Sequence, residues 1–98
     1  MTGDDQDIIV RDNPAAGRYE LFAAGKLAGL ATYVLGDGAM TIPHTEVRSR
    51  YEGRGLGARL AKFALDDARR RGLRVVPRCP FIAAYIERHP EYADLVVG

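Results

Sequence analysis

The stretch RYEGRGLG at residues 50–57 stands directly before ARLAKFALDDARRR, a run whose apolar residues recur at helical spacing. Glycines occupy three alternate positions at the predicted helix start, and no Ser, Thr, Asp or Asn stands there to cap the helix. Free amides at a helix start carry a partial positive charge, and glycine lets a ligand approach the backbone. The stretch therefore predicts an anion site, although its spacing alone fits a turn that only reverses the chain equally well.

The apolar period of the chain changes at this stretch. The residues before it predict four strands, at 7–12, 18–24, 27–35 and 39–47, with a hairpin turn at Gly25-Lys26. The residues after it predict a helix over 56–71 that stops at Gly72, a strand over 73–76 and a helix over 81–89. The strand–helix–strand segment requires a parallel pair joined by a right-handed crossover. The fold class is therefore α/β of the α+β type, with a mixed, mainly antiparallel sheet and a β-α-β-α second half.

Length and composition indicate one globular domain spanning residues 1–98. The chain is 47% hydrophobic and 28% charged, which is typical of a folded soluble protein. Its single cysteine, Cys79, excludes an internal disulfide and favours a reducing compartment. The acidic start MTGDDQD does not resemble a signal peptide, and no apolar run is long enough for a membrane helix. We expect a cytoplasmic protein, a monomer, with no membrane partner.

The formal net charge of +1 hides an uneven distribution. Between Arg48 and Arg78 there are ten basic residues and three acidic ones, a local balance of +7. This excess predicts an anionic ligand, and a phosphorylated cofactor, a nucleic acid and a solvated helix face all remain open on charge alone. The chain has no motif for nucleic-acid recognition, and its aromatic residues do not alternate with the basic ones. We therefore expect no nucleic-acid partner.

The glycine stretch matches neither of the two best-known phosphate loops. A P-loop needs a Lys followed by Ser or Thr, and a Rossmann loop needs GxGxxG, whereas this stretch reads GxGxG. Arg50-x-x-Gly53-x-Gly55, between the fourth predicted strand and a helix, matches the [Q/R]xxGx[G/A] signature of the GNAT superfamily of N-acetyltransferases. Together with HTEV, PRCPF and AAYIERHPEYADLV, it makes the chain resemble the short, single-domain GNAT subfamily of about 100 residues over residues 27–96.

This resemblance implies acetyl-CoA as co-substrate, an amine as acceptor and no metal. It implies that turn amides hold the pyrophosphate, and that the pantetheine enters where the fourth and fifth strands splay apart. The implied cofactor-binding residues are Val47, Arg48, Arg50, Tyr51, Glu52, Gly53, Arg54, Gly55, Leu56, Gly57 and Ala58, with further charge from Arg59. The usual early helix pair is absent, because only residues 13–17 separate the first two predicted strands. We therefore expect an open acceptor side.

Two side chains on the fourth predicted strand are candidates for acid–base chemistry. His44 could act as a general base, because histidine side chains ordinarily exchange a proton near neutral pH, and Glu46 could orient it or act through water. Strand alternation predicts that Met40, Ile42, His44 and Glu46 share one face. Pro43 cannot donate a ladder hydrogen bond and predicts an irregularity in this strand. A histidine that only hydrogen-bonds within the sheet is the alternative interpretation.

Cys79 is the third catalytic candidate. It precedes Pro80, which suits the first position of a helix, so the thiol is predicted to cap the last helix, where the dipole and Arg78 would favour thiolate. The short subfamily carries a matching His and Cys, which implies His44 and Cys79 as partners. Cys79 could accept the acetyl group or protonate the leaving coenzyme A, and direct transfer to the amine remains open. A small buried cysteine without catalytic function is the alternative from residues alone.

The end of the last predicted helix carries two further residues with stated expectations. His89, before Pro90, is expected to cap that helix, and Tyr85 is expected to pack in the core. The family often places a tyrosine acid on this helix. A non-catalytic module that binds acyl-CoA through the same turn is the alternative function.

Overall fold

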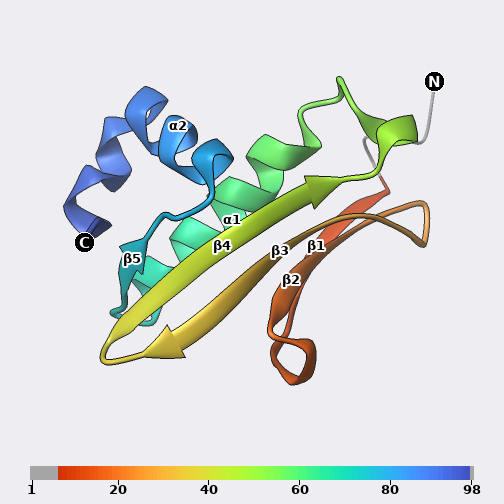
Figure 1. The fold of residues 1–98 in the computed structure, drawn as a ribbon. Helices are drawn as coiled ribbons and strands as arrows, with labels where there is room; N and C mark the ends of the chain where they lie inside the picture. Colours follow the sequence, from red (N-terminus) through yellow and green to blue (C-terminus); the bar gives the residue numbers. More distant parts are fainter. Residues whose placement is uncertain (1–6, 98) are drawn as a thin grey trace.

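Five strands form a single sheet in the order β1-β2-β3-β4-β5 in this computed structural model, which describes residues 7–97 (Figure 1). The first four strands are antiparallel neighbours, and β5 runs parallel to β4. Their bounds are Ile8–Asn13, Arg18–Ala23, Lys26–Gly36, Ala39–Val47 and Arg74–Val76. The predicted mixed, mainly antiparallel sheet is confirmed. Residues 1–6, with most of the acidic start considered above, lie outside the described residues.

Two-residue turns connect β2 to β3 and β3 to β4. Ala24 and Gly25 form the first turn with φ of 50° and 82°, since Ala23 already pairs with Lys26. Asp37 and Gly38 form the second, with φ of 56° and 74°. Both residues of each turn are left-handed, which matches the twist of the strands they join. The predicted hairpin is confirmed, but its turn lies one residue earlier than Gly25-Lys26.

Helix α1 (Leu56–Arg70) covers one face of the sheet and contacts all five strands. Its buried residues recur at helical spacing and include Leu60, Ala64 and Leu65. They pack against the inner sheet face, including Leu21 and Ile42. The helix ends as predicted, because Gly72 adopts φ of 71° just beyond it. The packing of one amphipathic helix on one face of the sheet thus forms most of the core.

The outer face of the sheet has no helix pair inserted between β1 and β2. A single 3-10 turn, η1 (Pro14–Ala16), joins these strands, and the side chain of Asn13 accepts a hydrogen bond from the Ala16 amide at 3.3 Å. Ile9 and Val34, which point away from α1, are therefore 58% and 63% exposed. This confirms the predicted absence of early helices at that position.

Strands β4 and β5 separate after a short parallel ladder. Pairing runs from Ala39 with Arg74 to Thr41 with Val76, and the Cys79 amide then donates to the Ile42 carbonyl at 2.9 Å. From there the chain leaves the sheet into α2 (Pro80–Arg88) and the 3-10 segment η3 (Pro90–Leu95). The second half of β4 is consequently left without β5 beside it, as the predicted splay requires.

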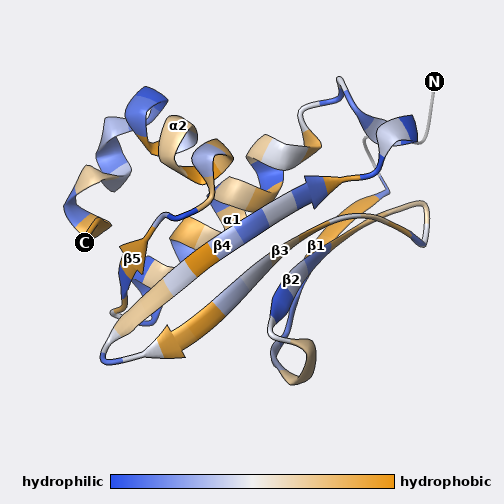
Figure 2. Cartoon of the chain, in the orientation of Figure 1, coloured by the Kyte–Doolittle hydropathy of each residue, from blue (hydrophilic) through white to orange (hydrophobic). Residues whose placement is uncertain are grey.

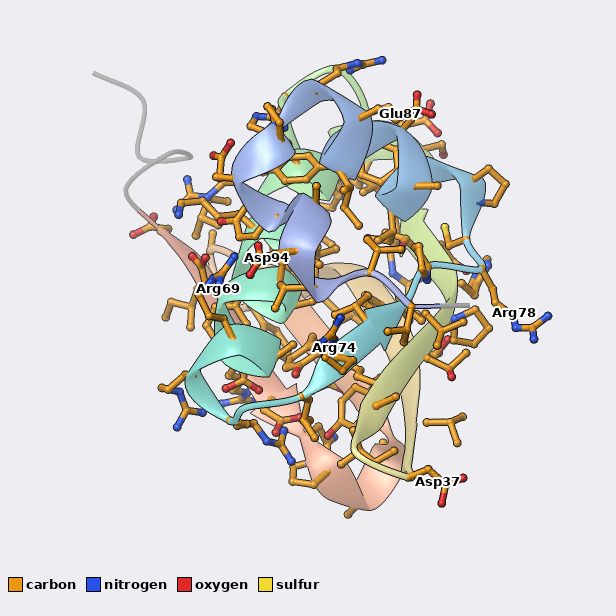
Figure 3. The ribbon with its side chains drawn as sticks, turned by 90° about the vertical axis from the view of Figure 1, so that its left-hand side faces the viewer. Asp37, Arg69, Arg74, Arg78, Glu87 and Asp94 are labelled. Carbon is orange, nitrogen blue, oxygen red and sulfur yellow. The ribbon has the colours of Figure 1, made fainter. Side chains whose placement is uncertain are left out.

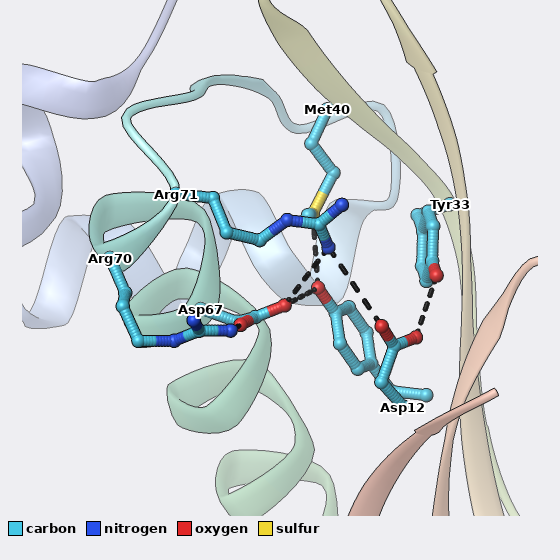
Figure 4. Close-up of polar contacts among 7 residues, drawn as sticks. Asp12, Tyr33, Met40, Asp67, Arg70 and Arg71 are labelled. Carbon is cyan, nitrogen blue, oxygen red and sulfur yellow. Dashed lines mark hydrogen bonds and ion pairs between the residues drawn. The ribbon is translucent and has the colours of Figure 1, made fainter. Parts of the chain in front are cut away.

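A polar network closes the carboxyl end of α1 against the sheet (Figure 4). The buried Asp67 carboxylate accepts from the Tyr19 hydroxyl at 2.6 Å, from Arg71 at 3.2 Å and from Arg70. Burial raises the pKa of the Asp67 carboxyl, but these donors outweigh it and hold that pKa below its usual value. Arg71 also lies 3.8 Å from Asp12, so the network continues into β1.

The cationic excess around α1 is partly neutralised by ion pairs. Lys62 pairs with Asp66 at 2.9 Å, and Arg69 pairs with Asp94 of η3 at 2.8 Å; Figure 3 shows Arg69 and Asp94 side by side. With Arg70 and Arg71 bound to Asp67, at least four of the ten cations form ion pairs within residues 7–97, along the middle and the carboxyl end of the helix. Asp66 and Asp67 are already counted in the local balance of +7, so among these acceptors it is Asp94 that lowers the charge available to a ligand.

Candidate active site

A β-bulge interrupts β4 at Pro43. The β3–β4 register passes from Val34 opposite Thr41 to Thr32 opposite His44, so that Ile42 and Pro43 together face one residue of β3. A bulge suits proline, which has no amide hydrogen for the ladder. The predicted irregularity at Pro43 is confirmed, and it changes which side chains the strand presents to each face.

The bulge reverses the alternation of side chains along β4. Met40 and Ile42 are fully buried against α1, but beyond the bulge the residue that packs against the core is Val47. His44 and Glu46 therefore point to the outer face, where their side chains are 58% and 49% exposed and lie 3.2 Å apart. The prediction that these two share a face with Met40 and Ile42 is wrong, because alternation was continued through the bulge. Figure 2 shows the change along β4, from apolar near its start to largely polar near its end.

The glycine turn begins α1 without a capping side chain. After β4 the chain forms the 3-10 turn η2 (Ser49–Tyr51), and then Gly53 and Gly55 adopt φ of 83° and 74°. Gly55 is the N-cap of α1, and no side chain there bonds a helix amide. The first amides of a helix have no acceptor within the helix itself. The predicted uncapped start is therefore confirmed, with its donors left for another acceptor.

A cleft of about 450 Å³ lies between this turn, the end of β4 and α2. Eight of its lining residues belong to the predicted cofactor set: Val47, Tyr51, Glu52, Gly53, Gly55, Leu56, Gly57 and Ala58. Six more were not predicted for it: Thr45, Phe81, Ala84, Tyr85, Arg88 and His89. The spacing of the α2 residues indicates one helix face, but sequence alone does not say what that face meets.

The predicted arginines lie outside the cleft lining. Arg50 and Arg54 line a second pocket of about 220 Å³ together with Lys26, and both guanidinium groups lie over the Tyr51 ring, 5.4 and 5.5 Å from its centroid. Arg48 is exposed, and its amide donates to the Ala28 carbonyl at 2.8 Å. The glycine turn thus lines one pocket and the arginine side chains line a neighbouring one, and Tyr51 lines both.

Cys79 is the N-cap of α2 with Pro80 after it, as predicted, and is only 5% exposed. Burial raises the pKa of its thiol, but the Thr45 hydroxyl and the backbone amides at the start of α2 outweigh burial and lower it. Arg78, expected to contribute, extends into solvent (Figure 3). No hydrogen bond joins His44 to Cys79 among the described residues, and Thr45 takes the place predicted for His44 beside the thiol.

The family model described as GCN5-related N-acetyl-transferase matches residues 18–95, which is most of the chain. The chain belongs to the GCN5-related N-acetyltransferase family. The signature around Arg50 predicted this membership. The family member has splayed strands β4 and β5, an uncapped glycine turn and a cleft that this turn lines.

This family member resembles known proteins in sequence and solved structures in fold. Protein NATD1 from human and from mouse is 36% identical over 56 residues, which is 57% of this chain. The chain spans about half the length of these curated relatives. The solution structure of a GCN5-like protein from Staphylococcus aureus matches with a TM-score of 0.72, covering 94% of this chain and 90% of that one at 22% identity. A ribosomal-protein-alanine N-acetyltransferase from Brucella melitensis matches with a TM-score of 0.57, covering 89% and 67% at 21% identity.

Helix α2 of this family member ends in a stacked pair of rings at the cleft. The Tyr85 and His89 rings stack with centroids 3.9 Å apart, and His89 Nδ1 lies 2.8 Å from the Tyr85 carbonyl oxygen. His89 is the C-cap, as predicted. Burial raises the pKa of Tyr85, which keeps its hydroxyl protonated and able to donate. Tyr85 therefore both packs in the core and lines the cleft.

The part of the chain that the structure describes has neither a metal-binding cluster nor a membrane-spanning helix. Residues 7–97 contain no group of three or more His, Cys, Asp or Glu side chains placed to hold a metal ion. None of the helices within that range has the length and apolar character needed to cross a membrane.

Proposed function

We propose that this protein transfers an acetyl group from acetyl-CoA to an amine. The observation that carries the proposal is the uncapped start of α1, whose amides open onto the same cleft that reaches Thr45 beside Cys79. Amides at a helix start suit the pyrophosphate, and the largely apolar cleft suits the pantetheine arm. The Cys79 thiol is not part of the cleft lining, but it lies next to Thr45, which is, so a nucleophile stands close to the proposed path of the thioester.

The size and the walls of the cleft support coenzyme A as its ligand. A volume of about 450 Å³ lies within the usual range for small-molecule sites. The turn approaches α2 closely, since a Cβ on Gly57 would lie 2.9 Å from the Phe81 ring. The missing side chain at Gly57 is what lets the Phe81 ring lie this close to the turn. Arg50, in the neighbouring pocket, adds positive charge at short range without contacting the cleft.

The chemistry of the proposed reaction has two routes. In the first, the Cys79 thiolate attacks the acetyl carbonyl, its sulfur bonds to the acetyl carbon, and coenzyme A leaves as thiolate; the amine then displaces Cys79 and loses a proton. In the second, the amine attacks the thioester directly. The lowered pKa of Cys79 supports the first route, since a thiolate is a nucleophile rather than an acid. His44 and Glu46, exposed on the outer face, suit proton removal from an amine that arrives from that side.

Calorimetry with acetyl-CoA tests the proposal directly. We expect saturable binding, followed by coenzyme A release when a panel of amines is added: polyamines, amino sugars and lysine peptides. Cys79→Ala should abolish transfer by the first route, and mass spectrometry of the intact chain mixed with acetyl-CoA alone should show a single added acetyl group. No binding at millimolar acetyl-CoA would remove the proposal.

A non-catalytic acyl-CoA binding module is the second candidate. It is favoured by one observation, that the predicted pair of His44 and Cys79 is not assembled around the cleft. This alternative predicts acetyl-CoA binding with no coenzyme A release for any amine in the panel. It also predicts that Cys79→Ala and His44→Ala bind acetyl-CoA as the parent does.

A further inference from the structure

The Thr45 side chain is the buried polar group in this site that sequence reasoning did not assign. Its hydroxyl oxygen is inaccessible to solvent and has no partner at ordinary hydrogen-bond geometry within the described residues, although it lies close enough to Cys79 to lower the pKa of that thiol. The residue also lines the cleft, whereas Cys79 is nearly covered. A buried hydroxyl without a partner is costly, so native proteins rarely keep one without a use.

The β4 bulge explains why Thr45 lies here. Without the extra residue at Pro43, alternation from Ile42 would place His44 on the inner face and Thr45 on the outer one. With the bulge, Thr45 faces inward, and the backbone bond from the Cys79 amide to the Ile42 carbonyl holds the start of α2 against this part of β4. Two independent backbone features therefore place Thr45 on the side of β4 that faces the start of α2, and Thr45 is among the groups that act on the Cys79 thiol.

We propose that Thr45 is a positioning residue for Cys79. When the thiol ionises, the Thr45 hydroxyl donates a hydrogen bond to the Cys79 sulfur and holds the thiolate at the cleft. The donor needs an acceptor, and a thiolate is a much better acceptor than a thiol. No covalent change at Thr45 is involved. The role in acetyl transfer rests on the proposed function, but the hydrogen bond itself does not.

Among residues 7–97, the charged and titratable side chains near Cys79 do not donate a hydrogen bond to its sulfur. Arg78 precedes Cys79 but extends into solvent (Figure 3). His44 and Glu46 point to the outer face of β4, and Tyr85, on the cleft side of α2, stays neutral. The remaining donors are backbone amides, those of Phe81 and Ile82 at the start of α2 and that of Thr45 itself, which a side-chain substitution leaves in place. Thr45 is thus the side chain whose removal should change the ionisation of the thiol.

Titration of the single cysteine in the intact chain tests this assignment. Thiolate absorbance in the ultraviolet is followed against pH, with Cys79→Ala as the blank, so that the signal has one source. Thr45→Val keeps the side-chain shape and removes the donor. We expect it to raise the thiol pKa, lowering the thiolate fraction at neutral pH by about tenfold. Thr45→Ser should restore the parent titration because it restores the hydroxyl.

Thr41→Val is the matched control, since Thr41 lies on the same strand on the side away from the core side chains Met40 and Ile42. It should titrate as the parent does. Thermal unfolding of each variant checks that the fold is kept, and Thr45→Ala supplies a second variant without the donor should Thr45→Val not fold. A parent-like titration in Thr45→Val or Thr45→Ala, or failure of Thr45→Ser to restore it, would overturn the assignment.

The titration needs no acetyl-CoA, so its outcome is separate from that of the proposed function. A raised thiol pKa in a protein that does not bind acetyl-CoA would support the role of Thr45 and remove the acetyltransferase proposal. If an acceptor is found, Thr45→Val should lower kcat and shift its pH profile upward, with KM for acetyl-CoA unchanged. An equal kcat with a raised KM would instead make Thr45 a cleft wall only and would overturn its positioning role.

Discussion

The two ends of α1 treat their polar groups in opposite ways. At the carboxyl end, Asp67 receives hydrogen bonds from Tyr19, Arg70 and Arg71. At the amino end, Gly55 offers no capping side chain, and the helix amides face a cleft. A helix of 15 residues separates the two by about 20 Å. The closed end therefore stabilises the fold, while the open end leaves its amides available to the ligand that we propose.

The difference shows which end of α1 contributes to the stability of this small domain and which end lowers it. An open helix end loses roughly 1 kcal/mol that a capping side chain would contribute, and left-handed glycines lose further chain entropy on folding. The network at the closed end ties α1 to β1 and β2 through Asp12 and Tyr19. A change at one end should therefore alter stability with little effect on binding, and a change at the other should do the reverse.

Asp67→Ala should give the largest effect. It leaves Tyr19 and the two arginines without their shared acceptor, and breaking such a buried pair costs about 3 to 5 kcal/mol of unfolding free energy. Urea unfolding measures the loss, and calorimetry should show coenzyme A affinity unchanged in the folded fraction. Asp66→Ala, next in the chain but exposed, is the control and should lose much less. Equal losses at the two positions would contradict the closed-end interpretation.

Acid should open the closed end by protonating Asp67. Although burial raises its pKa, the donors bring the folded value below that of the unfolded chain. The resulting stabilisation is complete above about pH 4, the unfolded value, and is lost as pH falls through the folded value. The stability gap between the parent and Asp67→Asn should therefore be widest at neutral pH and narrow below pH 4. A gap that stays constant in urea unfolding between pH 7 and pH 3 would show that another group controls the acid limb.

Sequence reasoning predicted the open end far better than it predicted the strand beside it. Apolar periods and turn residues predicted the elements to within two residues, and the residues before Leu56 predicted a helix start without a capping side chain. The anion site at that start stays a prediction. The faces of β4 were predicted wrongly because Pro43 signals a bulge but does not say on which side of it the alternation resumes. Thr45 was missed for that reason. The Asp67 network joins residues 48 positions apart in the chain, and no local pattern indicates such a contact.

Ala58→Asp should make the open end more stabilising and less able to bind an anion. A carboxylate in the first turn of α1 complements the helix dipole and should add about 0.5 kcal/mol of stability. The same charge stands in the cleft lining and should repel the pyrophosphate, weakening coenzyme A binding about tenfold or more. Ala58→Asn, of similar size without the charge, is the matched control and should weaken binding less. Tighter binding in Ala58→Asp would exclude an anion at this turn.

Arg50→Gln should give the smallest effect and shows how far the open end extends. Arg50 lies over Tyr51 in the second pocket, outside the cleft lining, so its charge acts on a bound phosphate through solvent. Such an exposed charge contributes about 1 kcal/mol or less, and salt screens it over roughly 10 Å. Coenzyme A affinity should fall by less than tenfold at low salt, and the difference from the parent should shrink as salt is added. A loss above tenfold that persists at high salt would mean that Arg50 turns into the cleft and contacts the ligand directly, so that both pockets belong to one open end.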